Sequence, residues 1–331
     1  MVLTADGKGD GMTRGWARRG VLLLTACALV VAGITGSSSA APTSGSAPPD
    51  LNSVKWELDR TAPKISGTGW VVDEATNSVL VTYDDTVPSD KVAILKNAIA
   101  KHGSAVRLQR VPGETKFTMA GGDLIASPNP DGTNRNCSLG FNAINESTGV
   151  YYAITAGHCT LGRENWYTNN ALSVYLGNEV SSRLGGPNGV DMGLIQYRNA
   201  GLEKYGGIHR HDNGQYYNIT GSGGVSAGDY ICKSGIKTHT TCGNVTSPCG
   251  TITIQGVTLY CMIYSTMCVE GGDSGGPVWR SSLGVGIVSG GVLYNDPDLP
   301  NYGKCVPPEE GGRSYSYPLR EIESYYGIKV F

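Results

Sequence analysis

The stretch GGDSGGP at residues 271–277 surrounds a single serine, Ser274, with glycines and one aspartate. Glycine permits the tight turn that presents a serine hydroxyl as a nucleophile. Such a turn also directs backbone N–H groups toward a carbonyl oxygen that becomes negative during acyl transfer, and we predict Gly272 and Ser274 as these donors. A glycine-rich hairpin with an incidental serine would explain only the GGP at 275–277. The whole stretch favours a catalytic serine.

A serine hydroxyl is a weak nucleophile until a base takes its proton, so a histidine must lie close to it in space. The stretch TAGHC at residues 155–159 supplies His158, after an apolar run and before a cysteine that can hold its turn. His209, His211 and His239 lie in polar stretches, where we expect solvent-exposed rings. His158 is therefore the predicted base.

A buried carboxylate is expected to orient the imidazole and to stabilise its charged form. Asp191 opens the apolar run at residues 192–195. Asp212 and Asp229 lie at turns, where we expect solvated carboxylates. Asp191 is the predicted third residue, and an ordinary aspartate at the end of a strand is the alternative for it.

The chain order His158, Asp191, Ser274, with the stretches TAGHC and GDSGGP, resembles that of chymotrypsin-like serine proteases. The stretches CSLGFN at 137–142, GDYICKSG at 228–235 and SGG at 289–291 resemble the bacterial streptogrisin and α-lytic protease group.

This resemblance runs from about Met119 to the C-terminus. It implies an all-β body of two six-stranded antiparallel β-barrels. His158 and Asp191 would lie on the first barrel, Ser274 on the second, and the cleft between them.

Composition and local patterns agree with an all-β fold. The 331 residues include 48 glycines and only 16% charged residues, which favours short strands with tight turns. Lys and Arg (26) nearly balance Asp and Glu (28), so charge indicates neither nucleic acid nor a membrane surface as a partner. A short helix is predicted between Pro318 and Gly327. The predicted strands include residues 150–155, 190–197, 216–220, 251–263 and 285–289.

The N-terminus has the pattern of a secretory signal peptide, which we place at residues 1–40. Arg14, Arg18 and Arg19 precede an apolar run at 21–34 that gives way to small residues. An uncleaved anchor is the alternative, but the run is shorter than the ~20 residues that a spanning helix needs. We therefore expect an extracellular protein.

Residues 41–118 are predicted to contain a linker and a small α/β unit without cysteine, with structure beginning near Val54. Its strands are expected at 69–72, 78–83 and 105–111 and its helix at 89–102. A second linker is predicted at 121–136.

The family resemblance implies that residues 41–118 include a pro-region, which assists folding and blocks the cleft as an intramolecular inhibitor. The protease domain would then span residues 119–331. An independent binding domain is the alternative for the front unit.

Eight of the nine cysteines remain once Cys27 leaves with the signal, and an even number in an oxidising setting indicates disulfides. No pair has the spacing of zinc ligands. The chemistry requires no metal and no cofactor. The predicted bridges are Cys137–Cys159, Cys232–Cys242, Cys249–Cys261 and Cys268–Cys305.

By the same resemblance, residues 266–271 and 289–291 should line the substrate pocket. Trypsin-like members place an aspartate where this chain has Cys268, and glutamate-specific relatives place a histidine where it has Val288. Gly290 and Gly291 leave room for a large side chain, so a large apolar or aromatic residue before the scissile bond is expected. The pocket residues are predicted to be Thr266, Glu270, Gly271, Ser289, Gly290 and Gly291.

Three features depart from the family pattern. Gly271 stands where streptogrisins usually have proline, and the loop at 292–304 is longer than theirs. The predicted Cys249–Cys261 bridge is not one that the family pattern would include. Family members also use an internal cation to hold the aspartate before the serine, a role that falls here to Lys233 toward Asp273.

Together these patterns predict a secreted, monomeric serine endopeptidase made as a zymogen, with protein or peptide substrates. A catalytically inactive protease-like binding module is the alternative from another class. An esterase without peptidase activity would use the same residues.

Overall fold

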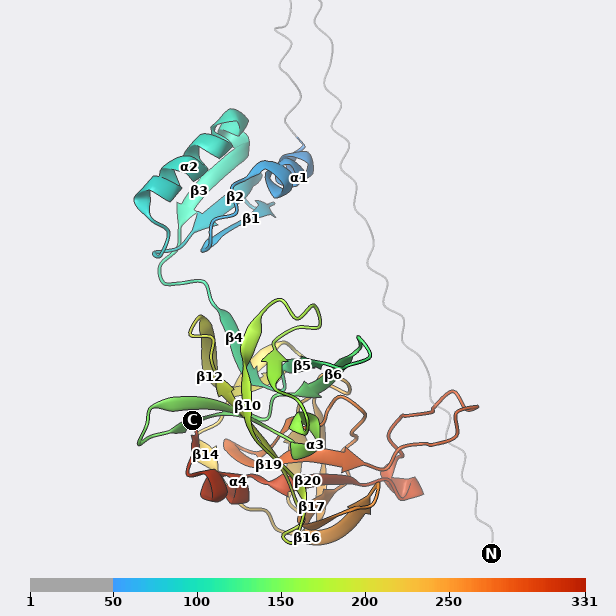
Figure 1. Cartoon of the computed structure of the whole chain (residues 1–331). Coiled ribbons are helices and arrows are strands. Elements are labelled where there is room, and N and C mark those ends of the chain that lie inside the picture. The colour runs from blue at the N-terminus through green and yellow to red at the C-terminus, as the bar shows by residue number, and fades with distance from the viewer. Residues whose placement is uncertain (1–49) are drawn as a thin grey trace, which may run out of the picture.

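The computed structural model describes residues 50–331, so the predicted signal peptide lies outside the described residues (Figure 1). The first described unit is the small α/β unit, and its core contains Leu58, Val79 and Leu95. Strand β2 pairs antiparallel with β1 and parallel with β3. The elements of this α/β unit are α1 (Leu51–Thr61), β1 (Thr68–Asp73), β2 (Ser78–Tyr83), α2 (Ser89–Ile99), the 3₁₀ helix η1 (Ala100–Ala105) and β3 (Val106–Arg110).

Helix α1 was not predicted as a helix, although structure was expected to begin near Val54. The helix begins at Leu51 because Asp50 caps it, with the Asp50 carboxylate accepting from the Asn52 amide at 3.1 Å. Only Val54 and Leu58 of this helix are buried, so its apolar pattern is too sparse to stand out in the sequence.

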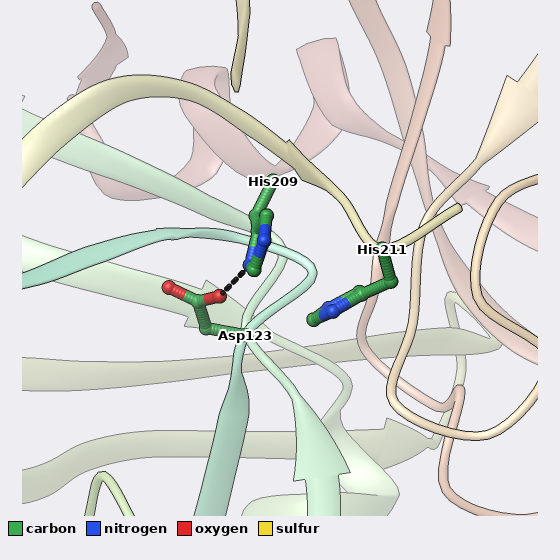
Figure 2. A group of neighbouring side chains, drawn as sticks. All are labelled: Asp123, His209 and His211. Atoms are coloured by element: carbon green, nitrogen blue, oxygen red, sulfur yellow. Dashed lines mark hydrogen bonds and ion pairs between the residues drawn. The ribbon is translucent and has the colours of Figure 1, made fainter. Parts of the chain in front are cut away.

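The predicted linker at 121–136 is wrong, because this stretch belongs to the β body. It contains the end of β4 (Phe117–Gly121), then β5 (Leu124–Pro128) and the start of β6 (Asn134–Ser138). Glycines and polar residues at the turns conceal a short apolar run in which Ile125 is fully buried. Figure 2 shows Asp123, from the turn between β4 and β5, beside His209 of β12 (Leu202–Arg210).

The first half of the β body is an eight-stranded sheet of order β21-β7-β8-β11-β10-β9-β5-β6, with a three-stranded sheet of order β13-β12-β4. Strands β12 and β4 run parallel, and the remaining pairs are antiparallel. Its other elements are β7 (Phe141–Asn145), β8 (Val150–Thr155), α3 (Gly157–Thr160), β9 (Asn165–Tyr167), β10 (Tyr175–Gly185), β11 (Val190–Tyr197), β13 (Gln215–Asn218) and β21 (Lys329–Val330).

The second half has six strands that pair in a ring, because β19 pairs with both β18 and β20. All six pairings in this ring are antiparallel, and the short β14 (Gly221–Ser222) adds a parallel partner to β19. The all-β fold with a small α/β unit before it is thus confirmed. The ring strands are β15 (Tyr230–Lys233), β16 (Thr241–Ile254), β17 (Val257–Ser265), β18 (Pro277–Arg280), β19 (Leu283–Gly291) and β20 (Ser314–Pro318).

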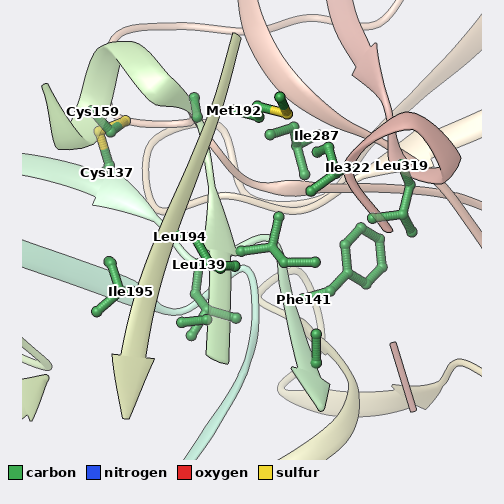
Figure 3. Packing of buried hydrophobic residues seen from close by; sticks show 14 of the residues in the cluster. Cys137, Leu139, Phe141, Cys159, Met192, Leu194, Ile195, Ile287, Leu319 and Ile322 are labelled. Carbon is green, nitrogen blue, oxygen red and sulfur yellow. A yellow bond between two sulfur atoms is a disulfide. The ribbon is translucent and has the colours of Figure 1, made fainter. Parts of the chain in front are cut away.

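The two halves of the β body share one hydrophobic core. Figure 3 shows Leu319 and Ile322, from helix α4 (Leu319–Tyr326), packed near Phe141 of the first half. After α4, which follows β20 of the second half, the chain returns to the sheet of the first half, where β21 pairs with β7. Helix α4 begins and ends as predicted, after Pro318 and before a left-handed Gly327. This packing fixes the two halves against each other.

Four disulfides join the eight cysteines within residues 50–331, as predicted. The Cys249–Cys261 bridge braces the hairpin of β16 and β17. Each bridge is expected to stabilise the fold by about 2–4 kcal/mol. Within the same range of residues, no helix combines the length and the apolar character needed to cross a membrane. The other three bridges are Cys137–Cys159, Cys232–Cys242 and Cys268–Cys305.

Candidate active site

The backbone around His158 positions its ring against Asp191. His158 lies in α3, a single helical turn after β8, and Asp191 is the second residue of β11, which pairs with β8. A side chain at Gly157 would place its Cβ 2.0 Å from the Arg183 carbonyl oxygen, so this turn requires glycine. The glycine of TAGHC therefore lets the histidine turn lie against β10.

Asp191 holds His158 through both carboxylate oxygens. Its Oδ2 lies 2.9 Å from His158 Nδ1, and its Oδ1 accepts from the His158 backbone N–H at 2.9 Å. Asp191 is 1% exposed. Burial lowers the pKa of the His158 ring, but the charge and hydrogen bond of Asp191 outweigh it and raise that pKa above its usual value. The pair has the arrangement of a base and its orienting carboxylate.

Ser274 lies on the loop between β17 and β18, and backbone hydrogen bonds clamp this loop to both halves. The Ser138 amide donates to the Ser274 carbonyl at 2.8 Å, and the Gly275 amide donates to the Val288 carbonyl at 2.7 Å. Gly275 has a φ of +81°, and a Cβ there would lie 1.9 Å from Thr155 Oγ1. The serine loop thus packs directly against the strand that leads to His158.

His158, Asp191 and Ser274 line one cavity of about 390 Å³. The structure therefore brings together at one site three residues that are far apart in the chain. The amides of Gly272 and Ser274 donate to no acceptor among residues 50–331, whereas the Asp273 amide between them donates to the Glu270 carbonyl at 3.0 Å. Two amides of the serine loop thus remain available to an incoming oxygen.

Asp273 forms the predicted contact with Lys233. Lys233 Nζ lies 3.1 Å from Asp273 Oδ2, and both side chains are fully buried. Asp273 also accepts from Thr238 Oγ1 at 2.6 Å and from the Glu270 amide at 3.0 Å. Burial raises the pKa of the Asp273 carboxyl, but the Lys233 charge and these donors outweigh it and leave the pKa below its usual value. An ionised Asp273 anchors the loop that carries Ser274.

Five of the six predicted pocket residues line the cavity, and Thr266 does not. The Thr266 hydroxyl instead accepts from the Asn244 amide at 2.9 Å, on the neighbouring strand β16. Thr266 follows Ser265, the last residue of β17, and this hydrogen bond directs its side chain toward β16 instead of the cavity. The five that line the cavity are Glu270, Gly271, Ser289, Gly290 and Gly291.

The apolar walls of the cavity include residues that the sequence reasoning missed. The hairpin of β16 and β17 extends beyond the ring and brings Ile254 and Val257 to the cavity. The alternating apolar residues of this hairpin were visible in the sequence, but their direction was not. Leu184, Leu259 and Leu293 were missed as well. Val269 lies within the segment 266–271 expected to line the pocket, and Val288 occupies the specificity position already considered; both line the cavity.

Two of the three histidines expected to be exposed are half-buried. His209 Nδ1 lies 2.8 Å from Asp123 Oδ1, and His211 Nε2 lies 2.8 Å from the Gly122 carbonyl oxygen. The turn between β4 and β5 covers both rings, whereas His239 is exposed as expected.

Asp212 and Asp229 pair with arginines rather than with a histidine. Asp212 lies 2.7 Å from Arg210, and Asp229 pairs with Arg280. Neither aspartate lines the cavity that contains His158. The choice of Asp191 over these two aspartates agrees with this placement.

A serine on a clamped loop, in the same cavity as an aspartate-bound histidine and within a chymotrypsin-like arrangement of strands, is typical of serine endopeptidases. Comparison with known proteins gives the same class. A model of the alpha-lytic protease prodomain family matches residues 49–102. Streptogrisin-A of Streptomyces griseus is 33% identical over 273 residues, which cover 81% of this chain and 80% of that protein.

Further relatives and solved structures agree. Serine protease 1 of Streptomyces fradiae is 32% identical over 81% of this chain and 68% of its own length. The structure of an alpha-lytic protease homolog, N4, has a TM-score of 0.53 at 26% identity, covering 65% of this chain and 100% of that chain. Thermobifida fusca Protease A has a TM-score of 0.51 at 28% identity, covering 64% of this chain and 98% of that chain. The chain belongs to the streptogrisin and α-lytic protease family, and it is a serine endopeptidase made as a zymogen.

Proposed function

We propose that His158, Asp191 and Ser274 are the catalytic triad and hydrolyse peptide bonds through an acyl-enzyme. The Ser274 hydroxyl attacks the peptide carbonyl while His158 takes its proton, and the Gly272 and Ser274 amides hold the negative oxygen. His158 then gives the proton to the leaving amine, and water repeats the sequence on the ester. The observation that carries this proposal is the Asp191-bound ring of His158 in the same cavity as Ser274.

A fluorophosphonate probe tests the role of Ser274. The wild-type enzyme should become covalently labelled and lose activity, whereas Ser274→Ala should remain unlabelled. Absence of labelling in a folded wild-type enzyme would support the inactive binding module instead. Hydrolysis of casein separates a peptidase from an esterase, because an esterase would cleave only small ester substrates.

We also propose that the enzyme prefers a large apolar or aromatic residue before the scissile bond. Ile254, Val257 and Val288 form apolar cavity walls, while Gly290 and Gly291 leave space beside them. Burial of an apolar side chain against such walls contributes about 1.5–3 kcal/mol. Tyrosyl and leucyl peptide substrates should therefore have higher kcat/KM than lysyl and glutamyl ones. Equal values would contradict this preference.

We also propose that the protein is secreted and then matured by proteolysis. Residues 1–40 act as signal peptide, residues 41–118 contain the linker and pro-region, and residues 119–331 form the monomeric protease domain. The pro-region assists folding and inhibits the cleft until it is removed. No metal or cofactor takes part in hydrolysis, and neither nucleic acid nor a membrane is a partner.

Expression of the full chain tests this maturation. N-terminal sequencing of the secreted product should place the mature start near Met119. The Ser274→Ala precursor should accumulate uncleaved, because the enzyme processes itself. Normal processing of this variant in a host without other proteases would contradict self-maturation.

A further inference from the structure

Asp123, His209 and His211 form a compact cluster of metal-binding side chains outside the catalytic cavity. One candidate ligand atom from each residue lies within 4.8 Å of the other two. Asp123 comes from the turn between β4 and β5, and the two histidines flank Arg210 at the end of β12. Figure 2 shows the three side chains gathered where this turn passes β12. The His-x-His spacing keeps both rings on one side, with centroids 4.2 Å apart.

Neighbouring groups already hold the three side chains in place. His211 Nε2 bonds to the Gly122 carbonyl oxygen at 2.8 Å, which leaves Nδ1 as its ligand atom. Asp123 Oδ2 accepts from the Ala120 amide at 2.8 Å, which leaves Oδ1. A metal-binding histidine commonly donates its other ring N–H to a backbone carbonyl in this way.

The His209 ring is held by stacking and by the carboxylate. Tyr216 stacks on it with centroids 5.0 Å apart and an interplanar angle of 16°. His209 Nδ1 lies 2.8 Å from Asp123 Oδ1, and these side chains are only 25% and 16% exposed. The cluster therefore loses little conformational entropy when it binds an ion.

We propose that Asp123, His209 and His211 bind a divalent transition-metal ion such as Zn²⁺. Two imidazoles and one carboxylate form a donor set that suits Zn²⁺, with water in the fourth position. When the ion binds, the proton of the neutral His209 ring resides on Nε2 instead of Nδ1, so the Nδ1 lone pair and Asp123 Oδ1 both bind the metal. Tetrahedral bonds of about 2.1 Å require these two atoms to separate to about 3.4 Å, which a small shift of the Asp123 side chain provides.

The site has a structural role. Asp123 lies four residues after the proposed mature start at Met119, while His209 belongs to β12 and His211 follows its last residue. A bound ion therefore ties the N-terminal segment of the mature enzyme to β12. Since the ion binds the folded chain preferentially, it raises the thermal stability of the enzyme in proportion to the logarithm of its concentration.

The test uses the mature wild-type enzyme with Zn²⁺ and with Co²⁺ as a spectroscopic probe. We expect one equivalent of metal to bind, Tm to rise, visible Co²⁺ absorption of a tetrahedral site to appear, and proteolytic activity to be retained. Retained activity distinguishes this site from metal binding at His158, which would inhibit the enzyme. Absence of binding, or binding that always accompanies inhibition, would overturn the proposal.

His211→Gln is the decisive variant, because a glutamine amide can keep the hydrogen bond to the Gly122 carbonyl while removing the ligand. It should fold and cleave peptides like the wild type but lose both the Tm shift and the Co²⁺ spectrum. Asp123→Asn should weaken both in the same way. His239→Gln is the matched control, since its exposed ring lies 5.7 Å from that of His211. An unchanged Tm shift in His211→Gln, or its loss in His239→Gln, would overturn the assignment of these three ligands.

Discussion

The buried carboxylate of Asp191 determines both the orientation and the pKa of the His158 ring. Both of its oxygens bond to His158, one to the ring and one to the backbone. The ring is therefore fixed in position and orientation, with Nδ1 facing the carboxylate and Nε2 left for the proton exchange that we propose with Ser274. The same negative charge raises the pKa of His158, so more alkaline conditions are needed to produce the neutral base.

Asp191→Asn should lower kcat/KM by about 10⁴-fold, because an amide no longer favours the tautomer that accepts the serine proton. Activity requires neutral His158, so it rises as pH increases through the pKa of this ring. Without the carboxylate that pKa falls, and the rise in activity should move to lower pH. Profiles of kcat/KM against pH measure both effects. An unchanged position of the acidic limb would show that Asp191 does not control the ring.

Lys233 and Asp273 form a second pair of buried charges, at the base of the serine loop. Lys233→Met should lower kcat more than it raises KM, because the loop would lose the anchor that orients its amides. The unpaired Asp273 charge should also destabilise the fold by about 3–5 kcal/mol.

The double variant Lys233→Met with Asp273→Asn separates the two effects. It removes the buried charge, so it should recover most of the stability measured by denaturant unfolding while turnover remains low. Full turnover in either variant would reject an anchoring role for this pair.

At the scale of elements, the long loop between β19 and β20 adds charge at the rim of the cavity. Lys304 lies 3.3 Å from Glu270, whose side chain is 8% exposed and lines the cavity. The Cys268–Cys305 bridge holds both residues close together, since each lies within two positions of one of its cysteines. Lys304 thus balances a carboxylate that would otherwise make the pocket acidic.

Lys304→Ala should raise kcat/KM for lysyl substrates relative to tyrosyl ones by about three- to tenfold, because Glu270 would then attract a cationic side chain. Lys304 is 54% exposed, so the fold should tolerate the change. The control Lys304→Ala with Glu270→Gln should return the ratio to its wild-type value. A ratio that responds to neither variant would exclude Glu270 from the specificity of the pocket.

At the scale of the whole molecule, the chain joins its two halves with its final residues. After α4, Ile328 and Val330 are buried in the common core, and β21 pairs with β7 of the first half. Since His158 and Ser274 lie on different halves, the geometry of the site depends on this connection.

Ile328→Ala should lower the free energy of unfolding by about 2–5 kcal/mol, because it leaves a cavity where the halves meet. Lys329→Ala is the control. Lys329 pairs with Glu146 on the surface, with side chains 67% and 62% exposed, so water screens the pair and its loss should lower the free energy of unfolding far less than Ile328→Ala does. Denaturant unfolding measures both variants. Equal effects would show that the C-terminal strand contributes little to the joint core.

Much of the candidate site was predictable because its reactive residues lie within short, characteristic stretches of sequence. The glycines of GGDSGGP and TAGHC allow left-handed turns and close contacts with neighbouring backbone that other residues resist. Each stretch therefore predicts its own local conformation. The four disulfides followed from the positions of cysteines at strand ends and around turns. The strands at 121–136 were missed because turn residues dominate that stretch and only a short apolar run lies between them.

The sequence by itself thus determined the class of fold and predicted the residues that we propose as nucleophile, base and orienting carboxylate. Only the tertiary structure decided which side chains line the cavity, that Thr266 faces away from it, and that Lys304 meets Glu270. It also brought Asp123 to His209, 86 positions later in the chain. The physical reason is that local turn chemistry depends on neighbouring residues, whereas contacts between distant segments depend on strand register and on the packing of two halves around one core.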